Sequence, residues 1–205
     1  SVIFLDIETM FLYINIVYIN EKCLGINQVV YSGHAEGRRF LTCILFNSIQ
    51  GESFMEKFFN PKSVVVVGAS NSSFNLGATI CNMLKDYLHY TGPVFVVNSK
   101  AETVNGCPGF SSVLDLPQTP DMAIIIVAAR HVPGIIKDCA KKGIKRVVIE
   151  SAGFAEDGQN GAAMQREIDE VSRKNGMRIM GPNCLGTLST RDKFCSFYGV
   201  NPSLV

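Results

Sequence analysis

The sequence lacks several patterns that would assign a function at once. Its seven cysteines contain no Cys-x-x-Cys pair and its three histidines stand at no ligand spacing, so we do not expect a metal site. Nineteen basic and 18 acidic residues leave a net charge of +1, which offers no broad basic face for nucleic acid. Neither a Gly-Lys-Ser/Thr sequence nor a Gly-x-Gly-x-x-Gly fingerprint occurs, which removes the two commonest phosphate-binding motifs.

The sequence also shows no pattern typical of a membrane-spanning helix or of a signal peptide. The apolar stretch Phe11–Ile19 is interrupted by Asn15 and falls well short of a spanning helix. It has neither the basic start nor the small-residue cleavage site of a signal peptide. The cysteines are scattered through segments typical of helices and strands, which fits reduced thiols. We therefore expect a cytoplasmic protein that binds no membrane.

The 205 residues are 47% apolar and 18% charged, a composition typical of a globular chain. This length holds one domain with a full core, or one domain plus an appendage. Residues 1–54 carry no recognisable motif, and the pattern changes at Met55. We expect 1–54 to be an unassigned N-terminal extension: an appendage, a remnant or a wrongly assigned stretch, with a strand-rich segment that packs on the domain as the alternative.

The chain is organised around a strand, a turn and a helix near its middle. Val64–Val67 is an unbroken β-branched run, which is typical of a central parallel strand buried on both faces. Gly68 ends the strand, small polar residues fill the turn, and Gly77 opens a helical pattern. Unpaired backbone N–H groups and the helix dipole converge at such a turn, so it predicts an anion site.

Four further apolar runs alternate with helical patterns along the chain. The expected strands are Val94–Val97, Met122–Ala129, Arg146–Glu150 and Arg178–Met180. Helices are expected over 131–142 and 161–175, each followed by a glycine. Five strands alternating with helices predict a doubly wound parallel α/β sheet, in which ligands bind at the carboxyl ends of the strands.

The end of the second strand indicates what kind of ligand the sheet takes. An NAD site usually places Asp or Glu there to bond the ribose hydroxyls. Asn98, Ser99 and Lys100 stand there instead, which suits a phosphate on the ribose. The pattern favours a 3′-phospho-ADP group, or NADP, over NAD.

Four motifs occur in order: FFNPKSVVVVGAS (58–70), VVNSK (96–100), ESAGFAEDG (150–158) and GPNCLG (181–186). Together they resemble the CoA-binding domain of the ADP-forming (NDP-forming) acyl-CoA synthetases, which are relatives of the succinyl-CoA synthetase α subunit. The resemblance covers about residues 55–190 and implies a Rossmann-like fold with CoA as its ligand. The same domain also opens some protein acetyltransferases and occurs as small stand-alone CoA-binding proteins.

The resemblance implies a set of CoA contacts. The residues that would cradle the phosphates are Gly68, Ala69, Ser70 and Gly77. The residues that would face the 3′-phosphate are Asn98 and Lys100, although Ser99 replaces the usual proline. Asn75 stands where many relatives have lysine, so that contact is altered. The residues that would flank the pantetheine arm and the reactive end are Ala128, Ala129, Ser151, Gly153, Phe154 and Asn183.

Each of these roles has a purely structural alternative. Gly68 and Gly77 could serve only a tight turn and close helix packing, and Lys100 could be a solvated surface lysine. The connection 151–154 could be an ordinary loop. His131 is expected to be a surface residue at a helix start rather than a catalyst, and Cys184 to be structural.

Three functions remain open from the sequence. We favour a CoA-binding domain or fragment of an ADP-forming acyl-CoA (acetyl-CoA-like) synthetase, with residues 191–205 leading into a further domain. No phosphohistidine or ATP-grasp segment is recognisable, so we expect CoA or acyl-CoA binding without the complete ligase reaction, no catalytic residue, and partnership with further domains or subunits. The alternatives are a stand-alone regulatory CoA-binding protein and an NADP-binding oxidoreductase domain. Homo-oligomerisation is left open.

Overall fold

The computed structural model describes residues 14–18, 28–35, 38–45 and 56–199. The chain divides into two compact units, Ser1–Ser53 and Phe54–Val205, each of which is described by itself. In the first, β1 (Ile14–Tyr18), β2 (Gln28–Ala35) and β3 (Arg38–Leu45) form an antiparallel sheet in the order β1-β2-β3. The rest of the expected extension 1–54, and residues 200–205 of the expected lead-in, lie outside the described residues.

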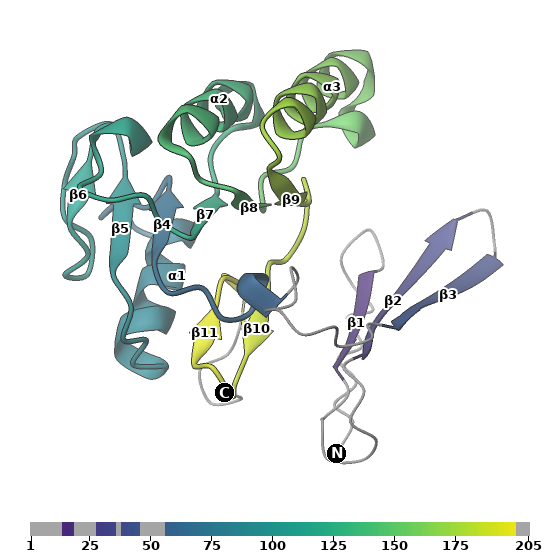
Figure 1. Cartoon of the computed structure of the whole chain (residues 1–205), viewed down its shortest axis with the longest axis horizontal. Coiled ribbons are helices and arrows are strands. Elements are labelled where there is room, and N and C mark those ends of the chain that lie inside the picture. The colour runs from purple at the N-terminus through teal and green to yellow at the C-terminus, as the bar shows by residue number, and fades with distance from the viewer. Residues whose placement is uncertain (1–13, 19–27, 36–37, 46–55, 200–205) are drawn as a thin grey trace. The chain divides into compact units, whose positions relative to one another are not determined.

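The second unit is built on a six-stranded parallel sheet (Figure 1). Its strands are β4 (Val64–Val67), β5 (Val94–Val97), β6 (Gly109–Phe110), β7 (Met122–Ile125), β8 (Arg146–Ile149) and β9 (Arg178–Met180). They lie in the order β6-β5-β4-β7-β8-β9, and all neighbours run parallel. This confirms the predicted doubly wound α/β fold.

Helices cover both faces of this sheet (Figure 1). α2 (Val132–Lys142) and α3 (Gly158–Lys174) pack on one face, where the side chains of Val65 and Val67 point. α1 (Leu76–Asn82) packs on the other face, against Val64 and Val66, and continues directly into the π-helical turn η2 (Met83–Tyr87). Both faces of β4 are therefore buried, which explains why its sequence is an unbroken valine run.

Two details of the predicted strands were wrong. β6 was not expected, because a two-residue strand after Pro108 looks like part of a turn-rich segment. β7 ends at Ile125 rather than at Ala129. The backbone N–H of Val127 leaves the ladder and donates to Ser151 Oγ at 3.0 Å, and Ala129 begins the 3₁₀ turn η4 (Ala129–His131).

Both long helices end close to where the sequence predicted. Gly143 terminates α2 in the left-handed conformation, with φ of 87°, as expected for a glycine after the last turn. α3 starts at Gly158, ahead of the expected Gly161. A Cβ on Gly161 would overlap the carbonyl oxygen of Phe154, so that glycine marks a close approach to the preceding loop rather than the helix start.

The remaining short elements connect and close the sheet. Three 3₁₀ turns, η1 (Glu56–Phe58), η3 (Val113–Asp115) and η5 (Ala155–Asp157), lie in connections. A hairpin of β10 (Leu188–Ser189) and β11 (Phe194–Cys195) follows β9. Thr187 Oγ1 donates to the Phe58 carbonyl oxygen at 2.9 Å, so the hairpin is tied to the start of the unit. Within the described residues, no helix is long and apolar enough to cross a bilayer.

Candidate functional site

The candidate site lies at the carboxyl edge of the parallel sheet. Because all six strands run in the same direction, the loops that follow β4, β5, β7 and β8 meet at this one edge. β4 pairs with β5 on one side and with β7 on the other, so the strand order reverses beside it. The loop from Gly68 to Gly77 therefore stands at the switch point of the sheet, where open α/β sheets bind ligands.

Asn75 holds this first loop in shape. Its Oδ1 accepts hydrogen bonds from the backbone N–H groups of Ser70 (3.1 Å) and Ala78 (2.8 Å). Its Nδ2 donates to the carbonyl oxygen of Gly68 at 3.1 Å. Asn75 is thus both the N-cap of α1 and a brace across the turn. It positions the loop, and its amide is fully engaged in these three hydrogen bonds.

Replacing Asn75 by alanine should lower the free energy of unfolding by about 1–2 kcal/mol, since the cap and the brace are both lost. Asn75→Asp keeps the capping oxygen but sets a carboxylate oxygen against the Gly68 carbonyl oxygen, so its stability should lie between those of wild type and Asn75→Ala. Urea denaturation of the three proteins measures the difference. Equal stabilities for wild type and Asn75→Ala would show that the turn holds its shape without the side chain.

The two glycines of the loop are required by close approaches of the backbone. Gly68 has φ of 106°, and a Cβ there would lie 2.2 Å from the carbonyl oxygen of Ile126. A Cβ on Gly77 would lie 2.7 Å from the Cα of Ala69. Close packing therefore requires glycine at both positions, as the structural alternative predicted. A ligand role at either position would be additional. Within residues 56–199, the backbone N–H groups of Leu76 and Gly77 have no acceptor; Leu76 is exposed, whereas Gly77 is buried.

Asn98 organises the loop after β5. Its Oδ1 accepts from the N–H groups of Lys100 (3.1 Å) and Glu102 (3.0 Å), and its Nδ2 donates to the Glu102 carbonyl oxygen at 2.9 Å. The Lys100 side chain is exposed. The loop therefore presents the lysine ammonium to solvent at the carboxyl edge, while the Asn98 amide is occupied in shaping the turn.

The loops after β7, β8 and β9 touch one another. Ser151 Oγ accepts the Val127 N–H, and the Ser151 carbonyl oxygen accepts the Asn183 N–H at 3.0 Å. A Cβ on Gly153, whose φ is 102°, would lie 3.2 Å from the Cβ of Ala129. The structure thus brings Ser151, Gly153, Ala129 and Asn183 together.

The other two predicted residues of these loops differ in their settings. Ala128 is the residue before η4, and its neighbour in sequence, Ala129, packs against the core. The Phe154 side chain is completely buried in the core under α2 and α3. Only the backbone of Phe154 can face the carboxyl edge in this conformation.

Glu150 was not among the predicted site residues, although it immediately follows β8. The residue is 6% exposed, and neither carboxyl oxygen has a hydrogen-bond partner among the described residues. Burial raises the pKa of Glu150 to about 9, so the carboxyl is neutral at pH 7 and can both donate and accept a hydrogen bond. A Cβ on Gly186 would lie 2.6 Å from its Oε1, so the 181–186 loop covers it closely. A charged residue that ends an apolar strand is the sequence signal that could have identified it.

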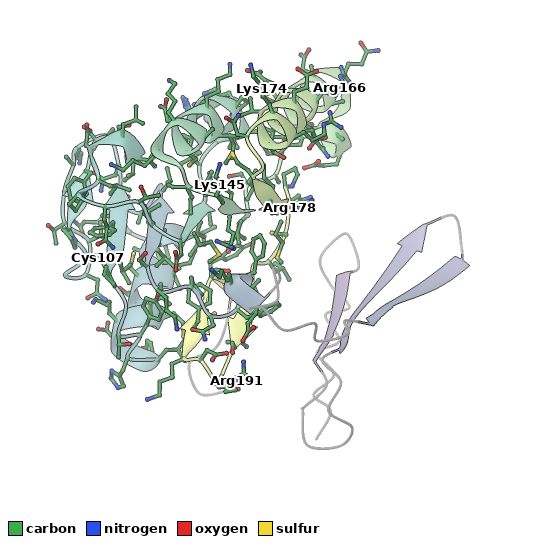
Figure 2. All side chains as sticks on the ribbon, viewed as in Figure 1. Cys107, Lys145, Arg166, Lys174, Arg178 and Arg191 are labelled. Carbon is green, nitrogen blue, oxygen red and sulfur yellow. The ribbon has the colours of Figure 1, made fainter. Side chains whose placement is uncertain are left out.

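Other features lie at the opposite, amino edge of the sheet. A cleft of about 180 Å³ is lined by residues that precede β4 and β5, including Lys62 and Gly92, together with the β10–β11 turn at Asp192 and Lys193. Figure 2 shows Lys145 and Arg178, which stand at the amino ends of β8 and β9. Neither feature adjoins the loops of the candidate site. Within the described residues, no cluster of three or more His, Cys, Asp or Glu could hold a metal ion.

Comparison with protein families gives one match over most of the second unit. A family described as a CoA binding domain matches residues 62–190. The α subunit of acetate–CoA ligase (ADP-forming) II of Pyrococcus furiosus is 41% identical over 136 residues, which are 66% of this chain and 29% of the relative. Acetate–CoA ligase (ADP-forming) II of Archaeoglobus fulgidus is 40% identical over 148 residues, or 72% and 22% of the two chains. The chain therefore spans less than a third of these relatives.

Solved structures agree with these matches. The apo form of dinucleotide-forming acetyl-coenzyme A synthetase 1 from Ca. Korarchaeum cryptofilum matches with a TM-score of 0.67 and 33% identity, over 71% of this chain and 31% of that one. PH0766 from Pyrococcus horikoshii OT3 matches with a TM-score of 0.66 and 41% identity, over 71% and 33% of the two chains. Both similarities cover only part of the larger proteins.

Proposed function

The chain belongs to the CoA-binding domain family, and we propose that it binds CoA or acyl-CoA as one part of an ADP-forming acyl-CoA ligase. The observation that carries the proposal is the set of loops at the carboxyl edge, which lie inside the matched residues 62–190. The ligase assignment is supported by the names of the relatives, several of which are ADP-forming CoA ligases. Further domains or subunits would supply the nucleotide chemistry. A cytoplasmic location is part of the proposal and is supported by the free thiols of Cys81, Cys107, Cys139, Cys184 and Cys195.

The ligand would lie across the edge from β5 to β9. The turn Gly68–Ser70 and the free N–H groups at the start of the helix that continues through η2 would hold the pyrophosphate. The Lys100 ammonium, in the loop shaped by Asn98, would pair with the 3′-phosphate. The pantetheine arm would pass over Ala128–Ala129, and the thiol would end beside the Ser151–Gly153 loop and Asn183.

CoA should bind more tightly than dephospho-CoA, and Lys100→Ala should remove that difference. A charge-assisted contact contributes about 1.5–3 kcal/mol, which corresponds to a loss of about tenfold or more in affinity for CoA alone. Calorimetric titration of both ligands into both proteins measures this. Lys174→Ala, at an exposed position near the end of α3, is the matched control and should leave both affinities unchanged.

Two results would count against the proposal. Equal affinity of the wild type for CoA and dephospho-CoA would remove Lys100 from the 3′-phosphate. Tighter binding of NADPH than of CoA would favour the oxidoreductase alternative, because both ligands carry a phosphate on the ribose.

A further inference from the structure

Among residues 56–199, Phe74 is the most exposed large apolar residue. Its side chain is fully exposed, and its backbone has φ of 61°, in the left-handed region that side chains with a Cβ rarely adopt. The residue directly precedes Asn75, whose amide is fixed by three hydrogen bonds to the loop and to α1. The backbone of Phe74 is therefore held next to a residue whose side chain is fixed by hydrogen bonds.

The Phe74 side chain buries no surface in the fold. An apolar residue just before an N-cap usually packs on the fourth residue of the helix, which here is Thr79. The full exposure of Phe74 shows that this contact is not made. The left-handed backbone opposes folding and the exposed ring contributes nothing to offset that cost, so the pair of features points to a role outside the fold.

The loop that carries Phe74 contacts the loop after β5 through Asn71. Asn71 Nδ2 donates to the Thr103 carbonyl oxygen at 2.9 Å, and the Asn71 N–H lies 3.4 Å from Glu102 Oε1. Phe74 lies on this loop between the Asn71 contact and the start of α1; the same loop carries the proposed pyrophosphate turn, and the loop after β5 presents Lys100. An adenosine 3′-phosphate held by these two groups would have its base at this part of the edge.

We propose that the Phe74 ring is a stacking platform for the adenine of CoA. The proposal rests on the proposed function and adds the residue that receives the base. Base–aromatic stacking needs only an exposed ring face, and its loss on removal of the ring weakens binding by about five- to a hundredfold.

The Phe74→Asn variant tests this, because asparagine tolerates the left-handed backbone and removes the ring. Its melting temperature should be unchanged or raised by about 2–4 °C, since strain is relieved and no contact is lost. Its affinity for CoA should fall by about tenfold, while its affinity for 4′-phosphopantetheine, which has no adenine, should stay the same. Tyr87→Ala removes another exposed aromatic ring, on η2, and should change neither affinity.

The wild-type chain has no tryptophan, so Phe74→Trp creates a single reporter at the proposed platform. CoA should quench its fluorescence and 4′-phosphopantetheine should not. If the wild type does not bind CoA, the proposed function itself fails. If the wild type binds CoA but Phe74→Asn binds it equally well, or loses CoA and phosphopantetheine equally, the adenine platform is overturned while the proposed function stands.

Discussion

The stability of the Glu150→Gln variant relative to wild type is expected to increase by about 2–3 kcal/mol as the pH rises from 5 to 7. The reason is the burial of a carboxyl without a hydrogen-bond partner at the end of β8. Burial raises the pKa of Glu150 from 4.5 to about 9 in the folded protein. Between these two values the unfolded chain releases the proton and the folded chain keeps it. Wild-type stability therefore falls as the pH rises through this window, and the glutamine variant lacks that loss.

Urea denaturation of both proteins at pH 5, 6, 7 and 8 measures the effect, and the informative quantity is the change of the difference with pH. Burial also raises the pKa of the nearby thiols of Cys184 and Cys195, to about 11 and about 12, so they stay protonated over this range. Glu170→Gln makes the same chemical change at an exposed position of α3 and is the matched control. A difference between Glu150→Gln and wild type that does not change with pH would show that the carboxyl is solvated or paired in solution.

The Gly77→Ala variant is expected to lose about 1–3 kcal/mol of stability, through overpacking against backbone that has no room to move. A Cβ there would lie 2.7 Å from the Ala69 Cα and 2.8 Å from the Ala69 nitrogen. Helix propensity alone would predict the opposite sign, because alanine is favoured over glycine by about 1 kcal/mol. The clash with the Ala69 backbone outweighs this preference. Relieving the clash would also displace the Gly68–Ser70 turn, to which Ala69 belongs.

Gly134→Ala is the matched control, since it makes the same change inside α2, where no atom lies within 4 Å of the added Cβ. It should leave the protein equally stable or slightly more stable. Stability by urea denaturation and CoA affinity by calorimetry should fall together in Gly77→Ala. Loss of CoA binding with an unchanged denaturation midpoint would instead support the ligand role that the resemblance implies, in which Gly77 cradles a phosphate.

The sequence predicted the sheet well because its signals are local. The valine run of β4 and the glycine after α2 each depend on one strand or one helix end. The extra strand β6 depends on its neighbour: Gly109 and Phe110 join the sheet only through pairing with Val96 and Val97. No local pattern in two residues reveals such a pairing.

The sequence names candidate positions for a ligand site, and the structure shows what some of their side chains do within the loops. Asn75 and Asn98 look like ligand contacts in the sequence, yet their amides are used to shape the two loops. Phe154 was predicted beside the ligand, and its side chain is buried in the core. Which side of a loop residue faces the ligand depends on long-range packing, which residue type and spacing do not encode.

The hydrogen bond from Thr187 to Phe58 spans 129 positions and has a consequence for the order of synthesis. Phe58 lies on the α1 side of the sheet, and β11 covers this face too. There the Phe194 ring contacts Tyr90 at a centroid distance of 5.7 Å. A ribosome that has released β4 to β9 has therefore not yet released the residues that cover Phe58 and Tyr90. The part of that face around Phe58 and Tyr90 stays open to water, and to other nascent chains, until residue 196 has emerged, whereas α1 already covers Val64 and Val66. Contacts of such long sequence separation form late and leave apolar surface uncovered in the meantime, so the vulnerable period of this unit falls near the end of its translation.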